Sequence, residues 1–89
     1  MIKIDFSPSF ERAFKRQVKN NRLDQDTFWQ RVELFINNPY DPILKTHRLS
    51  GKLKSMWAFS LGYDLRVVFY FQTTQNVVFV DIGTHNEVY

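Results

Sequence analysis

The stretch GTHNEVY at residues 83–89 holds two side chains that could take part in proton transfer, His85 and Tyr89. An imidazole titrates at about pH 6.5, so His85 could donate or accept a proton at cellular pH. The Tyr89 phenol offers a hydrogen-bond donor and a stacking surface. Gly83 permits a sharp turn after the apolar residues before it, which would let this tail fold back over a sheet. The ordinary alternative is a frayed chain end.

A second group of candidate residues lies in a basic stretch between Asp41 and Asp64, which contains no acidic residue. Its basic side chains are Lys45, His47, Arg48, Lys52 and Lys54. A local positive field of this kind favours a polyanion such as RNA. A solvated basic loop without function is an equally good interpretation of the pattern itself.

Composition restricts the kind of protein that can carry these groups. Eighty-nine residues predict a single domain over 1–89, with a core supplied by nine Phe, four Tyr and two Trp. The absence of cysteine excludes disulfides, thiolate chemistry and cysteine-based metal sites. The two histidines lack the spacing of partner ligands, so we expect no metal and no cofactor. No apolar run has the length of a signal peptide or membrane span, which predicts a soluble cytoplasmic protein without a membrane partner.

Periodicity predicts the elements that must position these residues. Residues 1–6 alternate as a half-buried strand. Residues 7–21 and 23–39 predict two helices, the first capped by Ser7 with Pro8 at its first position, and the second capped by Asp24 or Asp26. A short connection predicts an antiparallel helical hairpin. Residues 54–62, 65–71 and 77–83 predict three strands separated by turns, the first of them GYD at residues 62–64. The fold class is therefore α+β, in the order β-α-α-β-β-β, with an antiparallel sheet and the helical hairpin packed on one face.

Strict alternation along each strand predicts which residues face the helices. The predicted helix-facing residues are Trp57, Phe59, Leu61, Leu65, Val67, Phe69, Phe71, Val78, Val80 and Ile82. The predicted opposite face consists of Lys54, Met56, Ala58, Ser60, Arg66, Val68, Tyr70, Val77, Phe79 and Asp81. This second face mixes polar and apolar groups around Arg66, which favours a binding surface. The tail with His85, Arg66 and the basic stretch around His47 could converge there.

The order of elements, the segment HRLSGKLKSMWAFSLGYDLRVVFYF and the closing GTHNEVY resemble the RelE/ParE superfamily of toxins from bacterial type II toxin–antitoxin modules. The resemblance covers essentially the whole chain and is strongest to the YafQ-like branch. It implies a toxin that cuts mRNA at the ribosome without metal, by attack of the RNA 2′-hydroxyl on the adjacent phosphate. It also implies a cognate antitoxin that holds the toxin silent.

The same resemblance implies roles for individual residues. His47 matches an active-site histidine, Asp64 an acid that assists proton transfer, and His85 the general acid for the leaving oxygen. Tyr89 matches an active-site aromatic residue, and Arg66 a phosphate-contacting arginine. The candidate catalytic set is therefore His47, Asp64, His85 and Tyr89. The candidate RNA- and phosphate-binding set is Arg48, Lys52, Lys54 and Arg66.

Three positions depart from the YafQ-like pattern. Ser60 replaces a histidine, Leu65 an aromatic residue and Asp81 an arginine. Two alternatives therefore stay beside the endoribonuclease. One is a ParE-like inhibitor of DNA gyrase without nuclease activity, which Ser60 and Asp81 favour and His85 and Tyr89 oppose. The other is a degenerate toxin that binds its antitoxin but has lost its chemistry.

Overall fold

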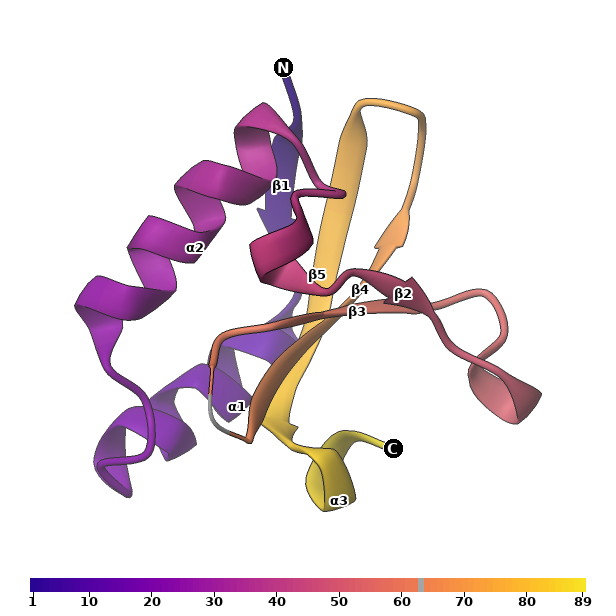
Figure 1. Cartoon of the computed structure of the whole chain (residues 1–89). Helices are drawn as coiled ribbons and strands as arrows, with labels where there is room; N and C mark the ends of the chain where they lie inside the picture. The colour runs from indigo at the N-terminus through magenta and orange to yellow at the C-terminus, as the bar shows by residue number, and fades with distance from the viewer. Residues whose placement is uncertain (63) are drawn as a thin grey trace.

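A five-stranded mixed sheet forms the frame of the molecule, with the strands in the spatial order β1-β5-β4-β3-β2 (Figure 1). The computed structural model describes residues 1–62 and 64–89. The strands are β1 (Lys3–Phe6), β2 (His47–Arg48), β3 (Trp57–Ser60), β4 (Leu65–Phe71) and β5 (Asn76–Thr84). β1 pairs with β5 in parallel, and the other three pairings are antiparallel. The α+β class is confirmed, and the parallel pair makes the sheet mixed.

Two long helices follow the first strand as predicted. α1 (Pro8–Lys19) begins after Ser7, whose hydroxyl accepts a hydrogen bond from the backbone N–H of Phe10 at 3.1 Å. α2 (Gln25–Asn37) is capped by Asp24, which accepts from the N–H of Asp26. Three short helical segments and the short strand β2 were not predicted: η1 (Pro42–Leu44), η2 (Gly51–Leu53) and α3 (His85–Val88). Tyr63, in the predicted GYD turn, lies outside the described residues.

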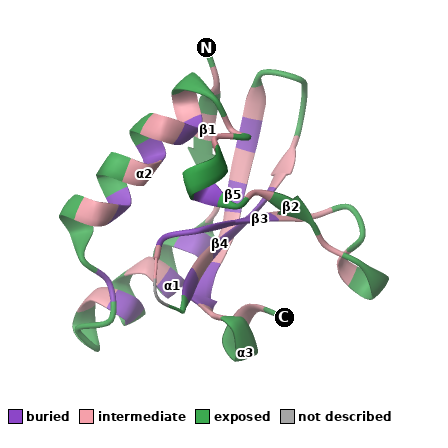
Figure 2. Ribbon diagram, viewed as in Figure 1, coloured by how far each residue is buried: buried purple, intermediate pink, exposed green. Residues whose placement is uncertain are grey.

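The core lies between the helices and one face of the sheet (Figure 2). Six of the fifteen described residues in its buried cluster are phenylalanines. The Phe35 ring of α2 lies 5.0 Å from the rings of Phe59 and Phe69 and 5.6 Å from that of Phe79, measured between centroids. All four rings are fully buried. Aromatic side chains bury much apolar area per residue, which explains how so short a chain closes a core. Among the described residues, no helix is long and apolar enough to span a membrane.

A β-bulge in β5 overturns part of the predicted face assignment. The register pairs Val68 with Asp81 but Phe69 with Phe79, so Val80 is an extra residue on β5. The extra residue reverses the alternation on one side of the bulge. Val77 and Phe79 are therefore buried in the core, not on the opposite face, and Val78 and Val80, which were predicted to face the helices, are not core residues. The assignment is correct for Ile82 and for the core-facing residues of β3 and β4.

The opposite side of the sheet, here called the open face, carries a row of paired residues from four strands. His47 pairs with Ala58, Ala58 with Val68, and Val68 with Asp81. Directly paired residues point to the same side of a sheet. In a neighbouring row, Arg66 lies between Ser60 and Gly83. β2 therefore brings His47 to the same side of the sheet as Arg66.

α1 flanks the part of β5 that β1 does not cover. β1 pairs with β5 over Asn76–Phe79, and the next residue of β5, Val80, accepts a hydrogen bond from the Ser9 hydroxyl at 2.7 Å. Further along, the Gln17 amide of α1 donates to the Glu87 carboxylate of α3 at 3.2 Å. α1 therefore runs beside β5 from the bulge to α3, and it borders the open face as well as the core.

Candidate active site

Tyr89 is the point at which the predicted site residues meet. Its ring centroid lies 4.6 Å from that of His85 and 6.4 Å from that of His47, with both pairs nearly perpendicular. The guanidinium carbon of Arg66 lies 6.0 Å from the centre of the same ring, which is at the limit of a cation–π contact. One phenol ring thus contacts side chains from β2, β4 and α3, which are far apart in the sequence.

The contacts of His47 define its tautomer. Its Nδ1 lies 3.0 Å from the backbone oxygen of Lys45, which can only accept a hydrogen bond. Nδ1 therefore carries the proton, and Nε2 of the neutral ring has a free lone pair. The Tyr89 hydroxyl lies 3.4 Å from that Nε2 and can donate to it in a long hydrogen bond. The exposed ring of His47 consequently presents a basic nitrogen towards Tyr89.

Tyr89 itself is suited to donate a proton in a hydrogen bond rather than to ionise. Partial burial raises the pKa of its phenol above the ordinary value, and the positive charge of Arg66 offsets only part of this effect. The phenol is therefore neutral at cellular pH.

Arg66 has a polar atom that the described residues do not satisfy. Its side chain is half-buried, and its Nε is enclosed without a hydrogen-bond partner in the described part of the chain. A buried donor without a partner costs free energy until a ligand or water supplies an acceptor. The guanidinium therefore lies beside Tyr89 with one donor that no described residue satisfies.

The basic stretch forms one wall of a hollow next to Tyr89. This hollow, here called the basic groove, has a volume of about 390 Å³. Its lining residues are His47, Arg48, Leu49, Ser50, Lys52, Leu53 and Tyr89. Arg48 donates from Nε to the backbone oxygen of Lys54 at 2.9 Å, which ties β2 to the end of η2. Lys52, which lines the groove, and Lys54, whose backbone oxygen binds Arg48, are both exposed.

Asp64 is the predicted catalytic residue that the structure does not join to the others. It is exposed in the turn before β4, where Leu65 pairs with Thr84 at the start of α3. Within residues 1–62 and 64–89, no hydrogen bond or ion pair connects it to His47, His85 or Tyr89. The structure therefore groups His47, Arg66, His85 and Tyr89, and it leaves Asp64 at the margin.

The three departures from the YafQ-like pattern have different environments. Ser60 is buried, and its hydroxyl accepts from the N–H of Gly62 at 3.1 Å. Leu65 belongs to the hydrophobic core. Asp81 is half-buried on the open face, where burial raises the pKa of its carboxyl. The hydrogen bond from the Ile82 N–H and the charge of Arg16 oppose that rise.

A second hollow on the open face was not predicted. It has a volume of about 400 Å³ and lies between α1, the sheet and the η2 segment, with Arg12 and Arg16 from α1 and Asp81 from β5 among its lining residues. The two arginines belong to the solvent-exposed side of a helix in the sequence, so periodicity could not connect them with the open face. Only the position of α1 beside β5 does so.

Sequence reasoning also missed Glu87, which holds α3 in place. The segment Thr84-His85-Asn86-Glu87 has the spacing of a capping box, in which a glutamate three residues after the cap accepts from the cap's N–H. The Thr84 N–H donates to Glu87 Oε1 at 2.9 Å. The capping-box pattern was therefore a signal available in the sequence.

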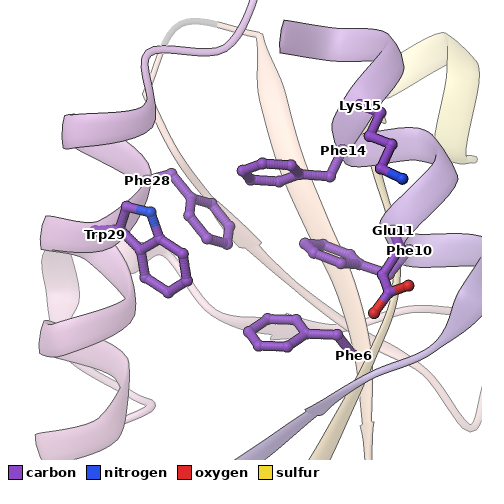
Figure 3. A pocket seen from close by; sticks show the side chains of 7 residues that line it. All are labelled: Phe6, Phe10, Glu11, Phe14, Lys15, Phe28 and Trp29. Carbon is purple, nitrogen blue, oxygen red and sulfur yellow. The ribbon is translucent and has the colours of Figure 1, made fainter.

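An apolar hollow of about 200 Å³ lies away from these residues, between α1, α2 and the end of β1 (Figure 3). Phe6, Phe10, Phe14, Phe28 and Trp29 form its walls, with Glu11 and Lys15 at its rim. None of these residues belongs to the predicted site. In the described part of the chain, no group of three His, Cys, Asp or Glu side chains could hold a metal ion.

Comparison with known proteins identifies what this chain resembles. The family described as "Bacterial toxin of type II toxin-antitoxin system, YafQ" matches residues 2–89. The crystal structure of YafQ from Escherichia coli superposes with a TM-score of 0.84 at 22% identity, covering 100% of this chain and 99% of that one.

Two further similar structures show a toxin bound to its antitoxin and a toxin bound to a metal. The DinJ–YafQ toxin–antitoxin complex of E. coli matches with a TM-score of 0.81 at 22% identity, over 99% of this chain and 97% of that one. A metal-bound toxin from Helicobacter pylori matches with a TM-score of 0.82 at 28% identity, over the full length of both chains.

Proposed function

This chain belongs to the YafQ family of toxins from bacterial type II toxin–antitoxin systems, and from that premise we propose that it is a cytoplasmic endoribonuclease that cuts mRNA at the ribosome. His47, Arg66 and His85 carry the reaction around the ring of Tyr89, without a metal ion or cofactor. A cognate antitoxin, of the kind that DinJ represents for E. coli YafQ, keeps the enzyme inactive.

The reaction is an internal transfer of the phosphoryl group. His47 Nε2 accepts the proton of an RNA 2′-hydroxyl, and the 2′-oxygen attacks the adjacent phosphorus. The bond from phosphorus to the 5′-oxygen breaks, and His85 in its imidazolium form donates a proton to that oxygen. The products are a 2′,3′-cyclic phosphate and a free 5′-hydroxyl, so the RNA gains and loses no atoms.

One observation carries this proposal: Tyr89 contacts both imidazoles of the chain and lies beside the half-buried guanidinium of Arg66. Cleavage by a 2′-hydroxyl needs a base, an acid and a cation beside the phosphate. Those three groups surround one ring here. Arg66 supplies the cation, and its Nε, which is enclosed in this structure, lacks a hydrogen-bond partner within the described residues.

His47 is a better candidate for the base than Asp64. The backbone oxygen of Lys45 holds the proton on Nδ1 of His47 and leaves Nε2 unprotonated, 3.4 Å from the Tyr89 hydroxyl. Asp64 is exposed at the margin of the site and makes no such contact with the described residues. Arg48, Lys52 and Lys54 would bind the RNA backbone along the basic groove.

The test is to induce the toxin in cells that lack its antitoxin and to map the 5′ ends of mRNA. His85→Ala is the catalytic variant, and Asn86→Ala, an exposed neighbour on α3, is the matched control. General acid catalysis contributes about 10²–10⁴-fold, so His85→Ala should abolish visible cleavage while Asn86→Ala retains it. The new ends should carry a 5′-hydroxyl and lie in register with codons.

Other outcomes would overturn the proposal and identify an alternative. Growth arrest with intact mRNA and damaged DNA would indicate a gyrase inhibitor of the ParE type. No effect on growth, together with tight binding of the antitoxin, would indicate a toxin that has lost its chemistry. Cleavage that persists in His85→Ala would exclude His85 as the general acid.

A further inference from the structure

α3 carries His85 and borders Tyr89, yet it has only four residues, His85–Val88. A helix this short is not stable by itself, because nucleation costs more than so few hydrogen bonds return. The positions of His85 and Tyr89 must therefore depend on contacts that α3 makes with the rest of the molecule. The side chain of Glu87 makes the polar contacts between α3 and the residues outside it.

Glu87 links α3 to three other places. Its Oε1 accepts hydrogen bonds from the Thr84 N–H at 2.9 Å and from Gln17 Nε2 at 3.2 Å. Its Oε2 lies 3.2 Å from Nη1 of Arg22, in the segment between α1 and α2. These hydrogen bonds, chiefly that from the Thr84 N–H, lower the pKa of the Glu87 carboxyl, so it is ionised at cellular pH.

Gln17 is an unusual residue for the buried side of α1. It is fully buried, its Nε2 donates to Glu87, and its Oε1 has no partner within the described residues. A buried amide oxygen without a hydrogen bond destabilises a fold. A glutamine that costs stability at this position indicates a role other than packing.

Gly83 shows how closely α3 lies against the end of β5. A Cβ atom at this position would lie 3.1 Å from Glu87 Oε1 and 3.2 Å from both Glu87 Cβ and Val88 Cγ1. Gly83 pairs with Arg66 across the sheet. Because glycine has no side chain, Glu87 and Val88 of α3 can pack directly against Gly83, next to Arg66 on β4.

We propose that Glu87, held by Gln17 and Arg22, is a positioning residue for the RNA cleavage proposed above: it fixes α3 so that the His85 ring packs edge-to-face against Tyr89, beside Arg66. This inference rests on the proposed function for its effect on rate. Glu87 itself contacts α1 and does not line the basic groove, so it acts through His85 and Tyr89 and not on the substrate.

Two variants of Glu87 test the positioning role in single-turnover cleavage of mRNA on programmed ribosomes. Glu87→Ala removes every one of these contacts, and Glu87→Gln keeps an oxygen for Thr84 and Gln17 but loses the ion pair with Arg22. Misplacement of a catalytic group by about 1 Å can cost about 10²-fold, so Glu87→Ala should slow cleavage at saturation by about 10- to 100-fold. Glu87→Gln should restore most of the rate, because an exposed ion pair contributes little.

The concentration of ribosomes that gives half-maximal rate should change by less than about twofold in both variants, because the cations of the basic groove are untouched. Asn86→Ala is the control on the same helix. The proximity of the His85 and Tyr89 rings can be measured without any cleavage assay, from a nuclear Overhauser effect between their protons in the free toxin. It should be present in the wild type, Glu87→Gln and Asn86→Ala, and absent in Glu87→Ala.

The variant Gln17→Met distinguishes an effect on the position of α3 from an effect on core packing. It also provides a test if Glu87→Ala fails to fold. Methionine fills a similar volume and removes the unpartnered oxygen, so the melting temperature should stay equal or rise. Cleavage should nevertheless fall, because Glu87 loses its donor on α1. A purely structural role would move stability and rate in the same direction.

The inference is overturned if Glu87→Ala keeps both its ring contact and its rate, or if Gln17→Met is as fast as the wild type. It is also overturned if Glu87→Gln is as slow as Glu87→Ala. If the wild type itself cuts no mRNA, the proposed function fails instead, and the ring contact in Glu87→Ala still decides whether Glu87 positions α3.

Discussion

Tyr89 illustrates how one side chain can organise a site by contact more than by titration. Burial raises the pKa of its phenol, its hydroxyl lies 3.4 Å from Nε2 of His47, and its ring packs edge-to-face against that of His85. The sequence supplied the residue types for this arrangement, because two histidines, an arginine and a tyrosine in a basic context are a plausible set for RNA cleavage. It could not supply the hydrogen bond to Lys45 that sets the tautomer of His47.

Asp81 gives a prediction for stability against pH. Burial raises the pKa of its carboxyl in the folded protein. The folded state then binds more protons than the unfolded state above about pH 3.9, so stability falls as the pH rises through the raised pKa. Asp81→Asn keeps an oxygen for the Ile82 N–H and removes the charge. We expect this variant to melt at a higher temperature than the wild type at neutral pH.

The gain from Asp81→Asn should shrink as the pH falls through the raised pKa of Asp81, and it should be lost below about pH 3.9, where the carboxyl is protonated in both states. Thermal melts of the variant and the wild type, from neutral pH down to below about pH 3.9, measure the difference in melting temperature. Asp5→Asn, at an exposed position of β1, controls for the loss of one negative charge. A lower melting temperature for Asp81→Asn at neutral pH would show that the carboxylate stabilises the fold.

At the scale of elements, the bulge at Val80 decides which residues face the helices. The alternation of side chains predicted the core-facing residues of β3 and β4 correctly, because neither strand contains an extra residue. It failed in β5 because nothing in the letters VVFVDIG marks an extra residue, and every position before Asp81 is apolar. The helix starts were predictable from Ser7, Pro8 and Asp24, whose capping chemistry is local.

The Ser9 hydroxyl, which donates to the carbonyl of Val80, should stabilise the bulge. We expect Ser9→Ala to lower the free energy of unfolding by about 1 kcal/mol, the typical value of one hydrogen bond. Urea denaturation measures the change. Ser50→Ala is the matched control, because Ser50 caps η2 without a side-chain hydrogen bond. Equal stability of the two variants would show that the bulge does not need this bond.

At the scale of the whole molecule, the positive charges are not spread evenly over the sheet. Lys52 and Lys54 follow β2, at one edge, and Lys3 lies on β1, at the opposite edge. If RNA lies along the basic groove, each lysine that contacts a phosphate contributes about 0.7 to the slope of log affinity against log salt for a single strand. Lys52→Ala and Lys54→Ala should each reduce that slope, and Lys3→Ala should leave it unchanged.

Titrations of a short RNA at several salt concentrations measure these slopes. A reduction in Lys3→Ala as large as in Lys52→Ala would place the RNA elsewhere. The net charge of +3 alone could not have located the binding surface, because α1 also carries several cations on its solvent side. The location comes from the strand order, which sets the two edges of the sheet apart.

The strand order also bears on how the protein is made. β5 follows every other strand in the sequence, yet it lies between β1 and β4 and contributes Val77, Phe79 and Ile82 to the interior. While a ribosome is still synthesising β5, β1 has no strand to pair with and the Phe35 ring lacks its contact with Phe79. Domains generally fold as units during translation. A nascent chain of this topology would therefore not complete its sheet or its core until β5 has been synthesised.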